Sequence, residues 1–83
     1  MKFFIAAYEE GNFLRASQIL GTVQSNVSFR IRKLETTLGG PLFERERHGV
    51  RPTPKARKLY RVAKRVVSLA DEAATTMKSD KAA

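Results

Sequence analysis

One short stretch concentrates hydrogen-bonding side chains, and its members are Gln24, Ser25, Asn26 and Ser28. Amides and hydroxyls both donate and accept hydrogen bonds, which is the chemistry that base edges in the DNA major groove require. A helix face that served only solubility would carry more Glu and Lys. Phe29 follows directly, and it would either contact a thymine methyl group or pack on a neighbouring turn. The stretch therefore favours base recognition by these five side chains over a merely solvated surface.

An apolar stripe runs through the same stretch and predicts that it is a helix. Its members recur at steps of three and four residues, and they are Val23, Val27, Ile31, Leu34 and Leu38. At 100° per residue they lie within roughly 80° of arc, as in a helix with one buried face. Thr22 is the predicted N-cap, and Gly39-Gly40-Pro41 ends the helix. The opposite face then holds Ser25, Phe29, Arg32 and Thr36, flanked by Gln24, Ser28 and Lys33.

Two helices before this one and a hairpin after it complete a compact unit. The first helix spans 1–10 and ends at Gly11, and the second spans 13–20 and is capped by Asn12. The second helix meets the amphipathic one at Gly21-Thr22, so residues 13–32 form a helix-turn-helix. Short β-compatible pieces at 42–45 and 50–51 flank a turn at 46–49. Aromatic residues are expected to fill or cover the core, and they are Phe3, Phe4, Phe13, Phe43, Tyr8 and Tyr60.

A long helix is predicted from Pro54 to Met77, because Thr53 supplies a hydroxyl cap and proline suits the first helical position. Its apolar residues recur as in a coiled-coil seam, which consists of Leu59, Val62, Val66, Leu69 and Ala73. A core this small is marginal by itself, so we expect two chains to pair through this seam. Residues 78–83 are expected to form a polar, disordered tail. The predicted units are thus 1–53, with the hairpin at about 42–52, and 54–77.

Positive charge is concentrated in the hairpin and the start of the long helix. The chain has 16 Lys and Arg against 8 Asp and Glu, a formal net charge of +8. Residues 44–65 contribute +7 of this, whereas 1–43 contribute +2 and 66–83 contribute −1. Such a footprint indicates a polyanionic partner and favours a DNA-facing hairpin with Arg45, Arg47 and Arg51 around its turn. The basic residues of the long helix could either attract the chain to the DNA backbone or simply keep the helix solvated. These residues are Lys55, Arg57, Lys58, Arg61, Lys64 and Arg65.

The composition argues against an enzyme, a metal centre and a membrane protein. A chain of 83 residues leaves little wall for a substrate pocket, which usually measures about 300 Å³ or more. There is no cysteine, and the single histidine, His48, lies in a predicted turn without partners for metal binding or general-base catalysis. No apolar run approaches the roughly 18 residues of a membrane helix, and no secretory leader is evident. We therefore expect no catalytic residue, no metal site, no cofactor and a cytoplasmic, nucleoid-associated location.

Several runs of residues, in this order and spacing, resemble the LysR-type transcriptional regulators. The runs are Asn12–Ser17, Gln24–Ser28, Ile31–Glu35, Leu38–Arg45 and Gly49–Pro54. Together the resemblance covers residues 2–75. It implies a mostly α fold, a winged helix-turn-helix with three helices and a small β-hairpin wing, followed by a long dimerisation helix. It also implies double-stranded DNA as the partner, bound by a homodimer or by a heterodimer with a related regulator.

The resemblance assigns roles to individual positions as well. In that family, side chains at the positions of Gln24, Ser25, Ser28 and Phe29 reach bases. Candidate contacts to the DNA backbone, or from the wing to the minor groove, are Arg15, Arg30, Arg32, Lys33, Arg45, Arg47, His48 and Arg51. Members of the family usually begin several residues earlier and continue into an effector-sensing domain. We therefore expect no small-molecule effector site in this chain.

Three functions remain open at this point. The favoured one is sequence-specific DNA binding by a LysR-type regulator that lacks its effector-binding domain. An alternative is a truncated dimerisation fragment that pairs with a full-length regulator and interferes with it. A third is a nonspecific nucleic-acid binder, whose affinity would fall steeply with salt and hardly depend on sequence.

Overall fold

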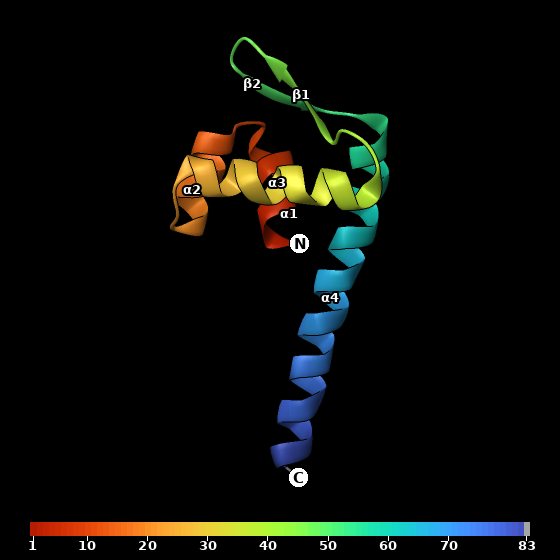
Figure 1. The fold of residues 1–83 in the computed structure, drawn as a ribbon. Coiled ribbons are helices and arrows are strands. Elements are labelled where there is room, and N and C mark those ends of the chain that lie inside the picture. Colours follow the sequence, from red (N-terminus) through yellow and green to blue (C-terminus); the bar gives the residue numbers. More distant parts are fainter. Residues whose placement is uncertain (83) are drawn as a thin grey trace.

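Three short helices, a two-stranded hairpin and one long helix make up the chain (Figure 1). The computed structural model describes the backbone of residues 1–82 and the side chains of residues 1–78. Its elements are α1 (Lys2–Glu10), α2 (Phe13–Leu20), α3 (Gln24–Leu38), β1 (Phe43–Glu46), β2 (Gly49–Pro52) and α4 (Pro54–Ala82). The hairpin lies on one side of α3, and α4 runs from the base of the hairpin toward the opposite side. The predicted winged helix-turn-helix with a long following helix is thus confirmed.

The boundaries of the first two helices follow from local chemistry. Asn12 has extended backbone and its side-chain oxygen accepts a hydrogen bond from the Arg15 N–H at 3.0 Å, so it caps α2 as predicted. Gly11 ends α1 with a φ of 62°, in the left-handed region that suits glycine. The turn between α1 and α2 is therefore short and fixed at both of its residues.

The predicted start of α3 was wrong. Val23, not Thr22, is the N-cap residue, and it makes no side-chain capping bond. The Thr22 hydroxyl instead accepts a hydrogen bond from the Asn26 amide at 3.0 Å. The threonine side chain thus stabilises the first turn of the helix through a side chain of that turn, and not through a backbone N–H.

The apolar stripe of α3 is buried only in its middle. Val27 and Ile31 are buried and Leu34 is half-buried, whereas Val23 and Leu38 at the two ends are exposed. The expectation that all five would face the core is therefore wrong for the end positions. The reason is geometric: α3 has 15 residues, about 22 Å at 1.5 Å per residue, and the core contacts only its middle turns, at Val27, Ile31 and Leu34.

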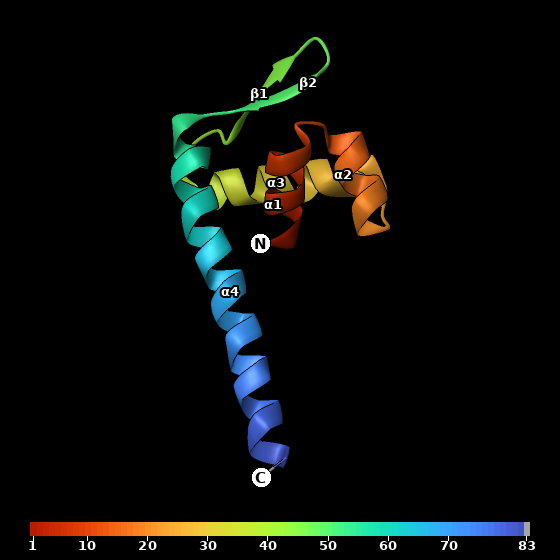
Figure 2. The ribbon, with the colours of Figure 1, turned by 180° about the vertical axis from the view of Figure 1, so that it is seen from behind.

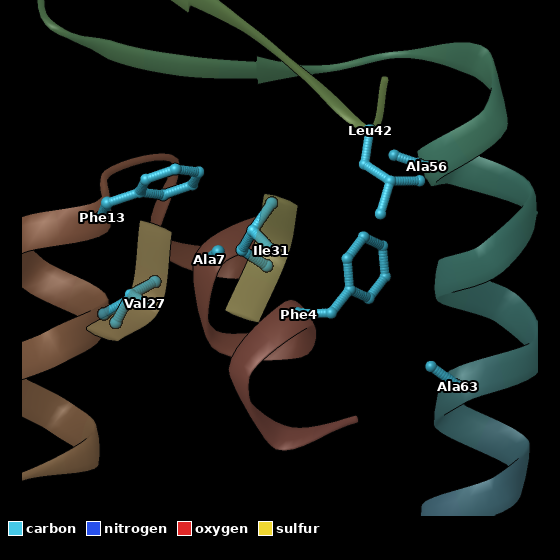
Figure 3. Close-up of a cluster of buried hydrophobic side chains, with 9 residues drawn as sticks. Phe4, Ala7, Phe13, Val27, Ile31, Leu42, Ala56 and Ala63 are labelled. Atoms are coloured by element: carbon cyan, nitrogen blue, oxygen red, sulfur yellow. The ribbon is translucent and has the colours of Figure 1, made fainter. Parts of the chain in front are cut away.

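The core joins α1, α2, α3, the start of the hairpin and the start of α4. Figure 3 shows the Phe4 ring between these elements, pointing toward Leu42 and Ala56. Phe43 is half-buried beside it, with its ring centroid 5.7 Å from that of Phe4 and 5.5 Å from that of Phe13. The aromatic residues predicted for the core therefore lie in or against it. Ala56 and Ala63 are fully buried as well, although neither was among the predicted core residues.

Helix α4 begins where predicted and extends further than predicted. The Thr53 hydroxyl accepts from the Ala56 N–H at 3.2 Å and donates to the Pro41 carbonyl at 2.8 Å, so it caps α4 and ties it to the chain entering the hairpin. The helix continues past Met77 to Ala82, so the expected disordered tail is helical over 78–82, while Ala83 lies outside the described residues. Within the residues that the structure describes, no helix has the length and apolarity to span a bilayer.

Candidate nucleic-acid interface

One face of α3 is open to solvent and carries most of the residues predicted to contact bases. Five side chains line a single open groove on it, and we call this surface the recognition face: Gln24, Ser25, Ser28, Phe29 and Arg32. Phe29 is 61% exposed, so it does not pack on a neighbouring turn to any large extent. The face therefore combines an amide, two hydroxyls, a guanidinium and one apolar ring on a rigid helix.

Two of the predicted residues on α3 point elsewhere. The Asn26 side chain is half-buried, and its amide donates to Thr22 as described above. The Arg30 guanidinium lies over the Phe3 ring of α1, 4.4 Å from the ring centroid. At 100° per residue, Arg30 lies about 160° around the helix from Arg32. The structure thus does not bring Asn26 and Arg30 together with the recognition face, whereas Lys33 lies at its edge, beside Phe29 and Arg32.

The hairpin lies beside the recognition face and shares grooves with it. One groove is bounded by the start of α2, by Gln24 of α3 and by the hairpin residues 45–50, which include Arg45, Arg47 and His48. A second groove lies between Ser28 and Arg32 of α3 and the hairpin side chains Phe43, Arg45 and Val50. Arg45 lines both grooves. The structure therefore brings the wing arginines Arg45 and Arg47, together with His48, next to the base-contacting candidates.

Strand pairing separates the arginines of the wing. The antiparallel register places Glu44 opposite Arg51 and Arg45 opposite Val50. Successive side chains of a strand alternate between the two faces, so Arg45 and Arg51 lie on opposite faces. Arg51 pairs there with both wing glutamates, at 3.0 Å from the Glu44 carboxylate and 3.2 Å from that of Glu46. Of the predicted wing cations, Arg51 is thus the one that the structure places away from α3 with its charge balanced.

A close backbone contact holds the hairpin against the turn between α1 and α2. The Val50 N–H donates to the Gly11 carbonyl at 2.9 Å. Gly49 has a φ of +147°, and a Cβ at this position would overlap the Gly11 carbonyl oxygen. Only glycine fits both the conformation and the approach. The tip residues Arg47 and His48 therefore extend from a strand whose position is fixed by backbone atoms.

The base of the hairpin is held by side chains from both adjoining helices. The Glu35 carboxylate of α3 accepts hydrogen bonds from the Leu42 N–H at 2.7 Å and the Phe43 N–H at 3.4 Å. The Lys55 ammonium of α4 donates to the Leu38 carbonyl at the end of α3, at 2.8 Å. Glu35 and Gly49 were not singled out from the sequence. A glutamate on an amphipathic helix and a glycine in a turn carry no signal that distinguishes these roles.

Arg15 lies on α2 and faces solvent. Its guanidinium is 3.8 Å from the Glu10 carboxylate, and the side chain is 68% exposed. An ion pair this exposed contributes little, about 0–1 kcal/mol, because water and salt screen it. Arg15 thus remains available to a polyanion that approaches the start of α2.

The predicted seam of α4 divides into an inner and an outer part. Leu59 is half-buried and packs against the core of its own chain. Val62, Val66 and Leu69 are 47%, 50% and 63% exposed, and Ala73 is exposed as well. We call these four residues the apolar stripe of α4. They lie at steps of four, three and four residues and so share one side of the helix.

Polar groups of α1 and α4 meet just before the free part of α4. The Tyr60 hydroxyl donates a hydrogen bond to the Glu9 carboxylate, and the Lys64 ammonium is 3.6 Å from the same carboxylate. The hydrogen bond to Glu9, with desolvation as the second cause, raises the pKa of the Tyr60 phenol above its usual value. Among the side chains that the structure describes, no group of three or more His, Cys, Asp and Glu is placed to hold a metal ion.

Comparison with known proteins shows the family. A family model described as bacterial regulatory helix-turn-helix protein, lysR family, matches residues 1–57. The HTH-type transcriptional regulator YofA of Bacillus subtilis is 40% identical over 73 residues, which are 88% of this chain and 26% of that protein. The HTH-type transcriptional regulator BudR of Klebsiella aerogenes is 36% identical over 73 residues, 88% of this chain and 51% of BudR. The chain therefore spans about a quarter of the length of YofA and about half that of BudR.

Solved structures agree in fold. The crystal structure of a complex of BenM_DBD with catB site 1 DNA superposes with a TM-score of 0.93 and 30% sequence identity, covering 99% of this chain and 92% of that one. A CbnR_DBD–DNA complex gives a TM-score of 0.89 and 29% identity, covering 94% and 90% of the two chains. With the fold, the family model and the sequence identity in agreement, the chain belongs to the LysR family of bacterial helix-turn-helix regulatory proteins.

Proposed function

We propose that this chain binds double-stranded DNA in a sequence-specific manner and regulates transcription. The observation that carries the proposal is the recognition face, on which Gln24, Ser25, Ser28, Phe29 and Arg32 line one open groove of α3. A helix of this width fits the major groove, where amide, hydroxyl and guanidinium groups distinguish base pairs by their hydrogen bonds. The BenM_DBD and CbnR_DBD structures, both DNA complexes, are similar to almost the whole of this chain and support the same partner here.

The arginines of the wing and of α2 supply affinity that depends on salt. Arg45 and Arg47 lie on the wing side with His48 beside them, and Arg15 lies on α2. Contacts from such groups to phosphates release counterions and fix the position of the protein on the duplex without distinguishing sequences. The wing is therefore expected to contact the minor groove or the backbone next to the major-groove segment that α3 occupies.

Pairing of two chains through the apolar stripe of α4 completes the proposal. Exposed valine and leucine at heptad-like spacing match a coiled-coil seam better than a free surface. A two-fold symmetric dimer would present two recognition faces to half-sites about 34 Å apart, roughly one turn of DNA. We place this activity in the cytoplasm at the nucleoid, with no small-molecule effector and no catalysis in this chain.

A second function is favoured by the same stripe, because its exposed residues form the segment that would pair with another chain. A chain of this kind can form a heterodimer with a longer relative and so interfere with that relative. Failure of the 83-residue chain to bind any duplex at low salt, together with co-purification with a longer relative, would favour this function over the first.

The experiment is selection of bound duplexes from a random pool at moderate salt, with the selected site then used for titrations. Sequence-specific binding predicts a recovered motif with two-fold symmetry. Gln24→Ala should weaken binding by about 1–3 kcal/mol per half-site and relax the base preference at one position. Gln18→Ala is the matched control, since Gln18 is also exposed but lines none of the grooves described above. Unrelated recovered sequences would reject sequence specificity and leave the nonspecific binder.

A further inference from the structure

Among the described side chains, helix α4 contacts the rest of its own chain only over its first half. Ala56 and Ala63 are buried, Leu59, Tyr60 and Val67 are half-buried, and every side chain from 68 to 78 is exposed. Figures 1 and 2 show the remainder of α4 leaving the core without a neighbour. The apolar stripe begins at Val62, next to the buried Ala63, and continues into the free part.

The contacts at the end of this packed part are directional. The Glu9 carboxylate of α1 accepts from the Tyr60 hydroxyl and lies 3.6 Å from the Lys64 ammonium, one turn further along α4. The Tyr60 ring stacks on Tyr8, with centroids 4.1 Å apart and an angle of 10° between the planes. We call Tyr8, Glu9, Tyr60 and Lys64 the α1–α4 clasp. The buried Ala56 and Ala63 allow a close approach of α4 to the core, and the clasp adds directional contacts beyond the bonds of Thr53 and Lys55 at the start of the helix.

We propose that the α1–α4 clasp sets the angle between α4 and the recognition unit, and through it the separation of the two recognition faces in a dimer. Glu9 is then a positioning residue for half-site spacing. The inference rests on the proposed function, because it assumes that pairing occurs along the apolar stripe and that each recognition face binds a half-site.

The dimensions of α4 make the separation sensitive to this angle. Tyr60 and Ala73 are about 20 Å apart along the helix. A tilt of roughly 10° at the clasp displaces the end of that segment by about 3.5 Å, which is close to the 3.4 Å rise of one base pair. Glu9 and Lys64 are about half exposed, so their ion pair adds little to the stability of the fold. Its loss is therefore expected to change geometry more than folding.

The test compares duplexes that carry two copies of the selected half-site at separations varied in single base-pair steps, together with a duplex that carries one copy. The wild-type chain is expected to prefer its best separation over the adjacent ones by roughly tenfold, because the two binding events reinforce each other only when the span matches. Glu9→Ala should reduce this preference to about twofold while binding to one half-site changes by less than about twofold. Glu9→Gln, which keeps an acceptor for Tyr60, should retain most of the preference.

The control is Glu10→Ala. Glu10 is the neighbouring carboxylate of α1, and it pairs with Arg15 of α2 instead of α4. This variant should keep the wild-type spacing preference. Retention of that preference by Glu9→Ala overturns the inference while leaving DNA binding intact, and an equal loss on single and paired half-sites also overturns it, because the role is then only structural. Absence of any half-site preference in the wild-type chain rejects the proposed function and the inference together.

A second measurement examines the clasp without DNA. The chain contains no cysteine, so a Gln18→Cys, Thr76→Cys double variant carries spin labels at these two positions only. Dilution of the labelled chain with unlabelled chain then restricts the measured distance to labels within one chain. The distance between the labels should show a narrow distribution, and Glu9→Ala should broaden it whereas Glu10→Ala should not. An unchanged distribution in Glu9→Ala contradicts the inference whatever the outcome with DNA.

Discussion

The recognition face of α3 and the apolar stripe of α4 are both exposed, but they differ in the chemistry that they offer. The recognition face has one apolar ring, Phe29, among amide, hydroxyl and guanidinium groups, with the wing cations beside it. The apolar stripe has Val62, Val66 and Leu69 without a hydrogen-bonding group among them. Hydrogen-bonding groups next to positive charge suit the edges and phosphates of DNA, whereas exposed aliphatic side chains at regular spacing suit a second helix. Exposure alone therefore does not identify a partner, but the side chains do.

The two surfaces also differ in how they are supported. The recognition face lies on α3, which packs against α1 and α2. Glu35 of the same helix holds the base of the wing through two backbone N–H groups. The apolar stripe lies mostly on a part of α4 that makes no contact with its own core. Binding of DNA can thus use a surface formed within one chain, whereas the free part of α4 gains neighbours only by association.

The largest effect is expected from a charged residue placed in the apolar stripe of α4. Val66→Asp should convert the dimer to a monomer, because pairing would bury an unpaired carboxylate. Affinity for a duplex with two half-sites should then fall by roughly 10²- to 10⁴-fold, the gain that linkage of two sites provides. Sedimentation and titration of paired and single half-sites measure both effects, and single half-site binding should remain.

The control for this substitution is Ser68→Asp. Ser68 is exposed on the same helix but off the stripe, and the change in charge is identical. It should leave a dimer with nearly wild-type affinity. Persistence of the dimer in Val66→Asp would show that α4 pairs through another surface.

An intermediate effect is expected from the two faces of the wing. Arg45 lines the grooves beside α3, whereas Arg51 is paired with Glu44 and Glu46 on the other face. Arg45→Ala should reduce the slope of log affinity against log salt by about 1 for each half-site, as expected when one phosphate contact is lost. Arg51→Ala should leave the slope nearly unchanged. Equal slopes for the two variants would mean that strand alternation does not decide which arginine contacts DNA.

The smallest effect concerns the one apolar side chain of the recognition face. If Phe29 contacts a thymine methyl group, Phe29→Ala should weaken binding to the selected site by about 1 kcal/mol, roughly fivefold. Replacing that thymine by deoxyuridine, which lacks only the methyl group, should weaken wild-type binding to a similar extent and leave Phe29→Ala unaffected. Equal loss by Phe29→Ala on every sequence would reject the methyl contact.

Features set by a few neighbouring residues were predictable from the sequence. The cap at Asn12, the glycine at the end of α1 and the start of α4 at Thr53-Pro54 all have short-range causes, and the structure has them where expected. The β-compatible pieces around residues 46–49 indicated the hairpin, and the resemblance to a known family identified it as a wing. Thr22 shows the limit, because its hydroxyl had two possible partners nearby and the sequence does not reveal which one is bound.

Contacts between distant elements were not predictable in the same way. Arg30 and Arg51 have the charge and exposure expected of DNA-contacting residues. Arg30 nevertheless lies over the Phe3 ring, and Arg51 pairs with two glutamates. Helical periodicity identified the middle of the α3 stripe correctly and its ends incorrectly, because periodicity gives the direction of a side chain and not the extent of the core. Similarly, nothing local indicates that Ala63 is buried while Val62 beside it is exposed.

The close approach of Gly49 to Gly11 determines which positions of the wing can vary. Because main-chain atoms anchor the returning strand, the residues at the turn, Arg47 and His48, can be exchanged without altering the anchor. Selection can then adjust affinity for the duplex by changing the charge at the tip. Any side chain at Gly49 would instead push the strand off its support and misplace the whole loop.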